Sequence, residues 1–129
     1  MKMKRIILTL TMLVALVATA SAQAEIKFDK LIHNFGSFED SNPVQKATFT
    51  FTNVGNKPLI INQAIASCGC TIPSYTKKPI APGEKGQISV TYNGKGMFPG
   101  HFKKSITVRS NGNVEMSRLY IEGVMTEKK

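Results

Sequence analysis

Hydrophobic and polar residues alternate along most of the chain, and the alternation is clearest between residues 46 and 52. Ala47, Phe49 and Phe51 share one face of this segment, and the lysine and threonines between them share the other. A period of two residues is typical of a β-strand that buries one face. We therefore predict a strand here whose alanine and phenylalanine side chains enter the core.

Weaker alternation of the same kind predicts further strands at 25–29, 31–38, 59–66, 87–93, 102–109 and 118–122, the second of them bulged. Turn residues separate these segments at 40–43, 53–58, 82–84 and 110–113, and the proline-containing stretch that follows residue 71 is expected to be turn-rich. About seven short strands without an amphipathic helix indicate an all-β fold. The expected architecture is an immunoglobulin-like β-sandwich of two antiparallel-type sheets.

The N-terminal 22 residues follow the order of a secretory signal peptide. Three basic residues precede an apolar run at 6–17, and Ala20, Ser21 and Ala22 form a small-residue cleavage motif. The apolar run is shorter than the roughly 20 residues that span a bilayer, although a retained anchor is the alternative interpretation. We expect cleavage after Ala22. This leaves a single domain over 23–129 that does not span the membrane and is periplasmic or secreted.

The chain of 129 residues carries 17 Lys and Arg against eight Asp and Glu, a net charge of +9 that falls to +6 when the signal peptide is removed. The basic residues are scattered and do not cluster beside stacking aromatics, so nucleic-acid binding is not expected. A solvated basic surface is the simpler interpretation. So few carboxylates also argue against a carboxylate-based hydrolase, and no cofactor is expected.

Cys68 and Cys70, the only two cysteines, lie one residue apart in the segment Ser67-Cys68-Gly69-Cys70-Thr71. A disulfide between them requires a bent backbone, which Gly69 makes accessible because it lacks a Cβ. Closing so short a loop stabilises a fold by only about 1.6 kcal/mol in the chain-entropy model. The disulfide is therefore expected to contribute little to the stability of the fold and to be easily reduced, as labile disulfides are. The chain has no tryptophan, and without a Cys…Trp…Cys pattern it is not an antibody-type domain.

Three roles remain open for the cysteine pair. It could be a reversible dithiol, or a soft-metal site in which Cys68 and Cys70 are joined by a histidine such as His101. It could also simply shape a loop without reacting. The typical redox motif has two intervening residues and a helix at the first cysteine, and this segment has neither. Lys77 and Lys78 would lower a thiol pKa if the following segment folded back towards the cysteines.

Five motifs match a known family: His33-Asn34-Phe35-Gly36, Phe51-Thr52-Asn53-Val54-Gly55 with Pro58-Leu59, Ser67-Cys68-Gly69-Cys70-Thr71, Pro79-Ile80-Ala81-Pro82-Gly83-Glu84 and Arg109-Ser110-Asn111. On these motifs the chain resembles the bacterial domain-of-unknown-function family 1573 over residues 25–125. The resemblance implies an immunoglobulin-like fold similar to chaperone-type and cilium-associated sandwich domains. It also implies an exported, envelope-associated protein, and it supplies no catalytic residues.

Taken together, these features favour a non-enzymatic binding or structural module of the cell envelope. Its partner would be another envelope protein, bound through loops at the end of the sandwich or by strand addition at an edge. The alternative function is thiol–disulfide exchange, or soft-metal binding, through Cys68 and Cys70. Ser67, Gly69 and Thr71 would shape that site, and Pro82 and Gly83 form the next turn.

Overall fold

The computed structural model describes residues 22–128, so the predicted signal peptide lies outside the described residues except for Ala22. The described part of the chain forms eight strands: β1 (Ile26–Phe28), β2 (Ile32–Glu39), β3 (Val44–Asn53), β4 (Ile61–Ala66), β5 (Thr71–Tyr75), β6 (Lys85–Asn93), β7 (Gly100–Ser110) and β8 (Met116–Thr126). Within that part no helix is long and apolar enough to cross a membrane.

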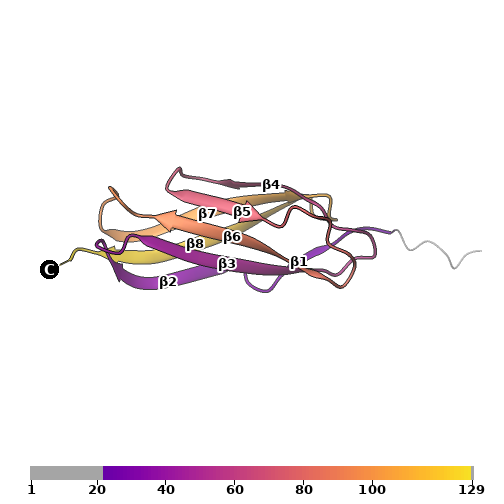
Figure 1. Cartoon of the computed structure of the whole chain (residues 1–129), viewed down its shortest axis with the longest axis horizontal. Helices are drawn as coiled ribbons and strands as arrows, with labels where there is room; N and C mark the ends of the chain where they lie inside the picture. The colour runs from indigo at the N-terminus through magenta and orange to yellow at the C-terminus, as the bar shows by residue number, and fades with distance from the viewer. Residues whose placement is uncertain (1–21, 129) are drawn as a thin grey trace, which may run out of the picture.

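The strands form two four-stranded sheets, in the orders β1-β3-β6-β5 and β2-β8-β7-β4. Figure 1 shows the two sheets stacked along the length of the molecule. Consecutive strands often belong to different sheets. For example, β1 and β5 are in the first sheet, whereas β2 and β4 are in the second. The predicted all-β, immunoglobulin-like sandwich is confirmed.

The sequence led us to expect two antiparallel sheets, but the second sheet also contains a parallel pair of strands. β2 pairs with β8 in the parallel direction, from Ile32 opposite Tyr120 to Glu39 opposite Thr126, with a bulge between Asn34 and Ser37. Parallel pairing requires a long crossover between the strands. Here the crossover includes most of the domain, because β8 is the last strand and β2 the second.

β5 is the strand that the sequence did not predict, because Pro73 lies at its centre. The strand is at the edge of its sheet and pairs only with β6. The amide of Asn93 donates to Cys70 O, and the amide of Thr76 donates to Gln87 O, so even-numbered residues of this segment bond to β6. Pro73 therefore turns its missing donor away from the sheet, which is where an edge strand tolerates proline.

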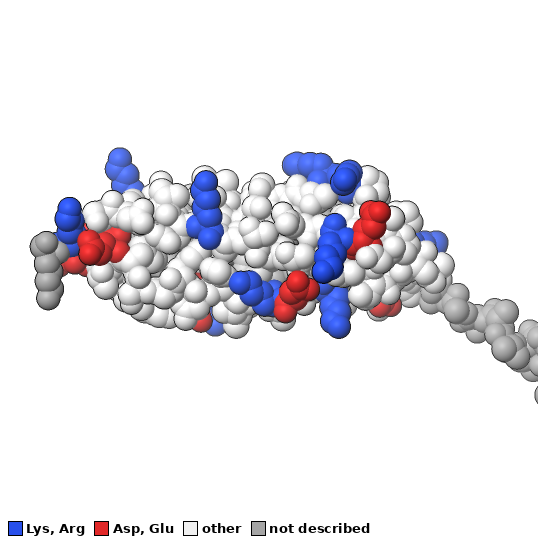
Figure 2. Space-filling view, turned by 60° about the horizontal axis from the view of Figure 1, so that its bottom comes forward, with Lys and Arg blue, Asp and Glu red and all other residues white. Residues whose placement is uncertain are grey.

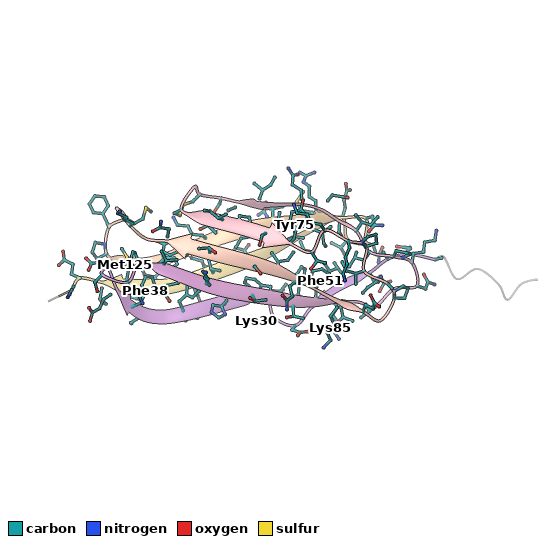
Figure 3. The ribbon with its side chains drawn as sticks, in the orientation of Figure 1. Lys30, Phe38, Phe51, Tyr75, Lys85 and Met125 are labelled. Carbon is teal, nitrogen blue, oxygen red and sulfur yellow. A yellow bond between two sulfur atoms is a disulfide. The ribbon has the colours of Figure 1, made fainter. Side chains whose placement is uncertain are left out.

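The core lies between the two sheets and is built from the alternating residues that the sequence indicated. Phe49, Phe51, Ile106 and Ile121 are fully buried. Aromatic rings fill one end, where Tyr92 stacks on Phe102 with their centroids 4.1 Å apart. Phe38 and Met125 lie at this end in Figure 3, and Phe51 lies towards the other. Burial of these side chains is the main source of stability.

Asn53 is a fully buried polar residue at the end of β3, in a segment that we had interpreted as a simple turn. Its side-chain oxygen accepts hydrogen bonds from the amides of Glu25 and Gly55, at 3.3 and 3.0 Å. Its side-chain nitrogen donates to the carbonyls of Lys57 and Ile80, at 2.7 and 2.9 Å. Asn53 thus joins the N-terminal segment, the β3–β4 loop and the β5–β6 loop at one end of the sandwich.

Candidate functional site

The segment from Ser67 to Cys70 connects β4 in one sheet to β5 in the other. The structure joins Cys68 and Cys70 in a disulfide, with their Cα atoms 5.3 Å apart. That separation is in the usual range for a disulfide. The bridge therefore closes the turn at which the chain crosses from one sheet to the other, and we call residues 67–71 the disulfide turn.

Hydrogen bonds fix the disulfide turn to both sheets. The amide of Ser67 donates to Ser105 O of β7 at 2.9 Å, and the Ser105 amide donates to the Ser67 hydroxyl at 3.2 Å. On the other side, Asn93 of β6 donates to Cys70 O at 2.8 Å. Within the turn, the Thr71 amide donates to Cys68 O at 3.2 Å. The turn is therefore held by the last residue of β6 and by the middle of β7.

Each sulfur of the bridge has a hydrogen-bond donor. The backbone amide of Cys70 donates to Cys68 Sγ at 3.0 Å. The Thr71 hydroxyl lies 3.6 Å from Cys70 Sγ, and because a disulfide sulfur carries no hydrogen the hydroxyl is the donor. Thr71 itself is buried, with 4% of its surface exposed. The sequence could not place this hydroxyl, because its contact with the sulfur depends on the fold of the turn.

Gly69 does not have the role that the sequence suggested. Positive φ angles in the described residues are confined to Gly36, Gly83, Gly96 and Gly100. A Cβ added at Gly69 would meet no atom within 4 Å. The bent backbone of the turn therefore does not depend on the conformational freedom of a glycine at this position.

The other candidate residues lie away from the disulfide turn. His101 is four positions before Ser105 on β7, about 13 Å along an extended strand, and its ring lies 4.0 Å from the Glu122 carboxylate. Pro82 and Gly83 precede β6, whereas Cys70 lies opposite its last residue, so they occupy the other end of that strand. In residues 22–128, no three His, Cys, Asp or Glu side chains come together as metal ligands.

The two lysines downstream of the cysteines do not fold back towards them. β5 runs away from the turn, and Lys77 Nζ lies 4.2 Å from the centre of the Tyr75 ring at its far end. Figure 3 shows Tyr75 along β5, away from the turn. Lys77 is therefore not the residue that would lower a cysteine pKa.

The β6–β7 connection carries the most exposed large hydrophobic side chain in the described residues, Phe98 at 94% exposure. Met97 beside it is 39% exposed. The amide of Met97 donates to Gly94 O and the amide of Gly94 to Pro43 O, so hydrogen bonds hold the start of this loop. Gly96, with φ of 80°, lies within the turn that this bond from Met97 to Gly94 closes. Figure 1 shows this loop at the same end of the sandwich as the C-terminus.

The sequence analysis did not identify Phe98 as a candidate residue. The available signal was a phenylalanine between glycines and a proline in a polar stretch.

The surface of the domain carries both positive and negative charges. Figure 2 shows lysine and arginine side chains in small separate groups with acidic residues among them on the face it displays.

A shallow cavity of about 200 Å³ lies at the opposite end, lined by Gln23, Glu25, Val54, Gly55 and Asn56. This is the end that Asn53 organises. A Cβ on Gly55 would lie 2.6 Å from the Glu25 amide nitrogen, so the close approach of the N-terminal segment requires glycine. The cavity does not include the disulfide turn.

Comparison with known proteins identifies the family. A family model described as Protein of unknown function (DUF1573) matches residues 26–125. The chain belongs to this family. No curated protein matches the chain.

Solved structures resemble this DUF1573 protein in fold. A protein of unknown function from Porphyromonas gingivalis W83 has a TM-score of 0.68 at 15% identity, with 84% of this chain and 50% of that chain covered. The present chain thus spans half the length of that protein. The ASH/PapD-like domain of human CEP192 has a TM-score of 0.63 at 11% identity, with coverage of 88% and 93%. The periplasmic chaperone SfaE has a TM-score of 0.55 at 7% identity, with coverage of 81% and 58%.

Proposed function

We propose that this DUF1573 protein is an exported interaction module of the cell envelope, and that the β6–β7 loop binds its protein partner. The observation that carries the proposal is the 94% exposure of Phe98 on a loop whose base is held by hydrogen bonds. Aromatic side chains that enter a pocket on a partner are typical of binding hot spots. An exposed phenylalanine on a constrained loop loses little further freedom on binding, which favours affinity.

Contact through side chains fits this domain better than strand addition at the β5 edge. Pro73 has no amide hydrogen to offer an added strand, and the outward amide of Thr71 already donates to Cys68 O. On the neighbouring edge strand β4, the Tyr75 hydroxyl donates to Asn62 O at 3.2 Å. Both edges therefore lack part of the hydrogen-bonding pattern that a new strand needs.

Two observations support export. The first is the N-terminal pattern of basic, apolar and small residues that ends at Ala22. The second is the disulfide between Cys68 and Cys70, because disulfides persist mainly in oxidising compartments. The similarity to the periplasmic chaperone SfaE is in keeping with an envelope location.

The proposal is tested by placing a photo-crosslinking amino acid at position 98 and recovering the crosslinked partner from the cell envelope. Position 114 is the matched control, because Val114 is 59% exposed in the β7–β8 turn near the N-terminal segment. We expect a discrete crosslinked product from position 98 and none from position 114. Identical products from both positions would contradict a role for this loop.

The affinity for the recovered partner gives a second measurement. Burying a phenylalanine side chain is worth about 1.5–3 kcal/mol, so Phe98→Ala should weaken binding about 10-fold to 100-fold. Val114→Ala should leave the affinity unchanged. Equal affinity of the Phe98→Ala variant and the wild type would show that this side chain is not the anchor.

A further inference from the structure

The two sulfurs of the disulfide turn lie in different surroundings. Both cysteines are half-buried, but Cys70 packs against the buried core and its carbonyl is bonded to Asn93 of β6. Cys68 stands between two exposed residues, Ser67 and Gly69, and its carbonyl is bonded only within the turn. If the bridge opens, the sheet holds Cys70 in place, whereas Cys68 is free to move outwards.

Each sulfur has a donor, and the two donors differ in what happens when the bridge opens. The Cys70 amide donates to Cys68 Sγ at 3.0 Å within the closed turn, so this bond is lost when Cys68 moves outwards. The buried Thr71 hydroxyl is already directed at Cys70 Sγ, 3.6 Å away. A hydrogen bond to an ionised acceptor is stronger than one to a neutral acceptor. The hydroxyl would therefore stabilise Cys70 as a thiolate more than it stabilises the disulfide. Because Thr71 is held in β5, this donor needs no rearrangement when the bond breaks.

We propose that the disulfide turn is a thiol-exchange site, in which a substrate thiolate attacks Cys68 and Cys70 is the leaving group. The substrate class is a dithiol carried by another exported polypeptide. This activity is separate from partner binding by the β6–β7 loop, and either proposal can fail without the other.

In the first step, the substrate sulfur forms a bond to Cys68 Sγ while the bond between Cys68 and Cys70 breaks. The electron pair of that bond passes to Cys70 Sγ, whose thiolate accepts the hydrogen bond from Thr71. In the second step, the other substrate thiolate attacks the substrate sulfur of the mixed disulfide and releases Cys68. The substrate leaves as a disulfide, oxidised by two electrons, and the cysteine pair is reduced to a dithiol. The two protons of the substrate thiols pass through water to Cys68 and Cys70.

The direction of attack can be measured on the wild-type protein with reduced glutathione, by quenching the reaction early, before a second glutathione or the released cysteine attacks the mixed disulfide. Rapid acid quenching, alkylation of the released thiol and peptide mass spectrometry then locate the glutathione. We expect glutathione on Cys68 and the alkyl group on Cys70, with a preference of at least about tenfold because attack depends on access to the sulfur. Equal labelling of both cysteines, a preference for Cys70, or a bridge that stays intact would overturn the proposal.

The role of Thr71 is tested by an isosteric change. Thr71→Val removes the donor and should slow opening of the bridge by glutathione about fivefold, because the lost hydrogen bond is to a developing charge. In a Cys68→Ser background, Thr71→Val should also raise the pKa of the Cys70 thiol, whereas Thr71→Ser should restore both values. A purely structural role would leave that pKa unchanged. An unchanged rate and pKa in a folded Thr71→Val variant would remove Thr71 from the mechanism.

Single-cysteine variants provide an independent comparison that needs no change at Thr71. In Cys70→Ser the outer thiol of Cys68 should react with an aromatic disulfide reagent faster than Cys70 does in Cys68→Ser, after correction for the thiolate fraction. The reverse order would contradict the assignment of Cys68 as the exposed sulfur. Val114→Ala serves as the matched control, since this exposed side chain lies in the β7–β8 turn and the change should leave all of these rates unchanged.

Discussion

Replacing Asn53 by alanine tests whether one buried amide holds together three separate segments of the chain. The side chain makes four hydrogen bonds, to the amides of Glu25 and Gly55 and to the carbonyls of Lys57 and Ile80. The bond to Ile80 is fully buried and the other three are partly buried. Alanine removes all four bonds and leaves the backbone groups without their partner.

The expected cost follows from the burial of each bond. A buried acceptor left without a donor costs about 1–3 kcal/mol, and each of the partly buried bonds contributes about 0.5–1.5 kcal/mol. Water entering the vacated space would recover part of this. We therefore expect Asn53→Ala to lower the free energy of unfolding by about 4 kcal/mol, a large share of the stability of a typical domain.

Equilibrium unfolding in urea measures this change directly. Asn56→Ala is the matched control in the same loop, because its exposed side chain accepts one hydrogen bond, from the Gln23 amide. It should cost less than about 1 kcal/mol. A loss of under about 1 kcal/mol for Asn53→Ala, or equal losses for the two variants, would refute the role given to Asn53.

Asn53→Asp separates the donors from the acceptor of this side chain. The aspartate keeps an acceptor for Glu25 and Gly55 but turns a carboxylate oxygen towards the carbonyls of Lys57 and Ile80. We expect it to be at least as destabilising as alanine at neutral pH. Stability should partly return as the pH falls and the carboxyl group becomes protonated, because it can then donate one bond. A variant as stable as the wild type at pH 7 would contradict this reasoning.

Three further predictions follow from the structure. Phe49→Ala should lower the free energy of unfolding by about 3–5 kcal/mol, whereas replacing both Cys68 and Cys70 by serine should lower it by about 1.6 kcal/mol. Equal losses in urea unfolding would show that the disulfide is a major source of stability. Burial, and to a lesser degree Lys30, lowers the pKa of His33 in the folded protein. The free energy of unfolding should therefore fall as the pH drops below about 6.5, because the unfolded chain takes up the proton first. His33→Gln should make the free energy of unfolding less dependent on pH in this range. Intact mass of the native protein should correspond to a chain beginning at Gln23, and a mass that retains the signal peptide would refute cleavage.

The local pattern of the sequence was sufficient to predict strands that bury one face. β3 is the clearest example, because Ala47, Phe49 and Phe51 alternate with polar residues and all three are buried. β5 escaped prediction because proline is normally excluded from a central strand, and only the tertiary position of this strand at an edge makes Pro73 acceptable. The parallel pairing of β2 with β8 has no local signal either, since it joins distant segments.

The candidate site was predictable only in part. The spacing of Cys68 and Cys70 allowed a short disulfide turn, but the sequence left open whether the pair is a disulfide, two free thiols or a metal site. The hydroxyl of Thr71 and the different surroundings of the two sulfurs depend on how the turn is bonded to β6 and β7, which spacing does not determine. Phe98 illustrates the opposite difficulty, because a phenylalanine in a sequence is more simply interpreted as a core residue than as an exposed one.

The position of β8 has a consequence for when the domain can fold. β8 is the last strand made, yet it lies between β2 and β7 in its sheet. Its end is bonded to the end of β2, where the Thr126 hydroxyl donates to Phe38 O across 88 positions of sequence. A chain emerging from a ribosome therefore lacks the centre of this sheet until the residues of β8 have been made. Such distant pairing slows folding, because β2 and β7 cannot complete their sheet until the strand between them is available.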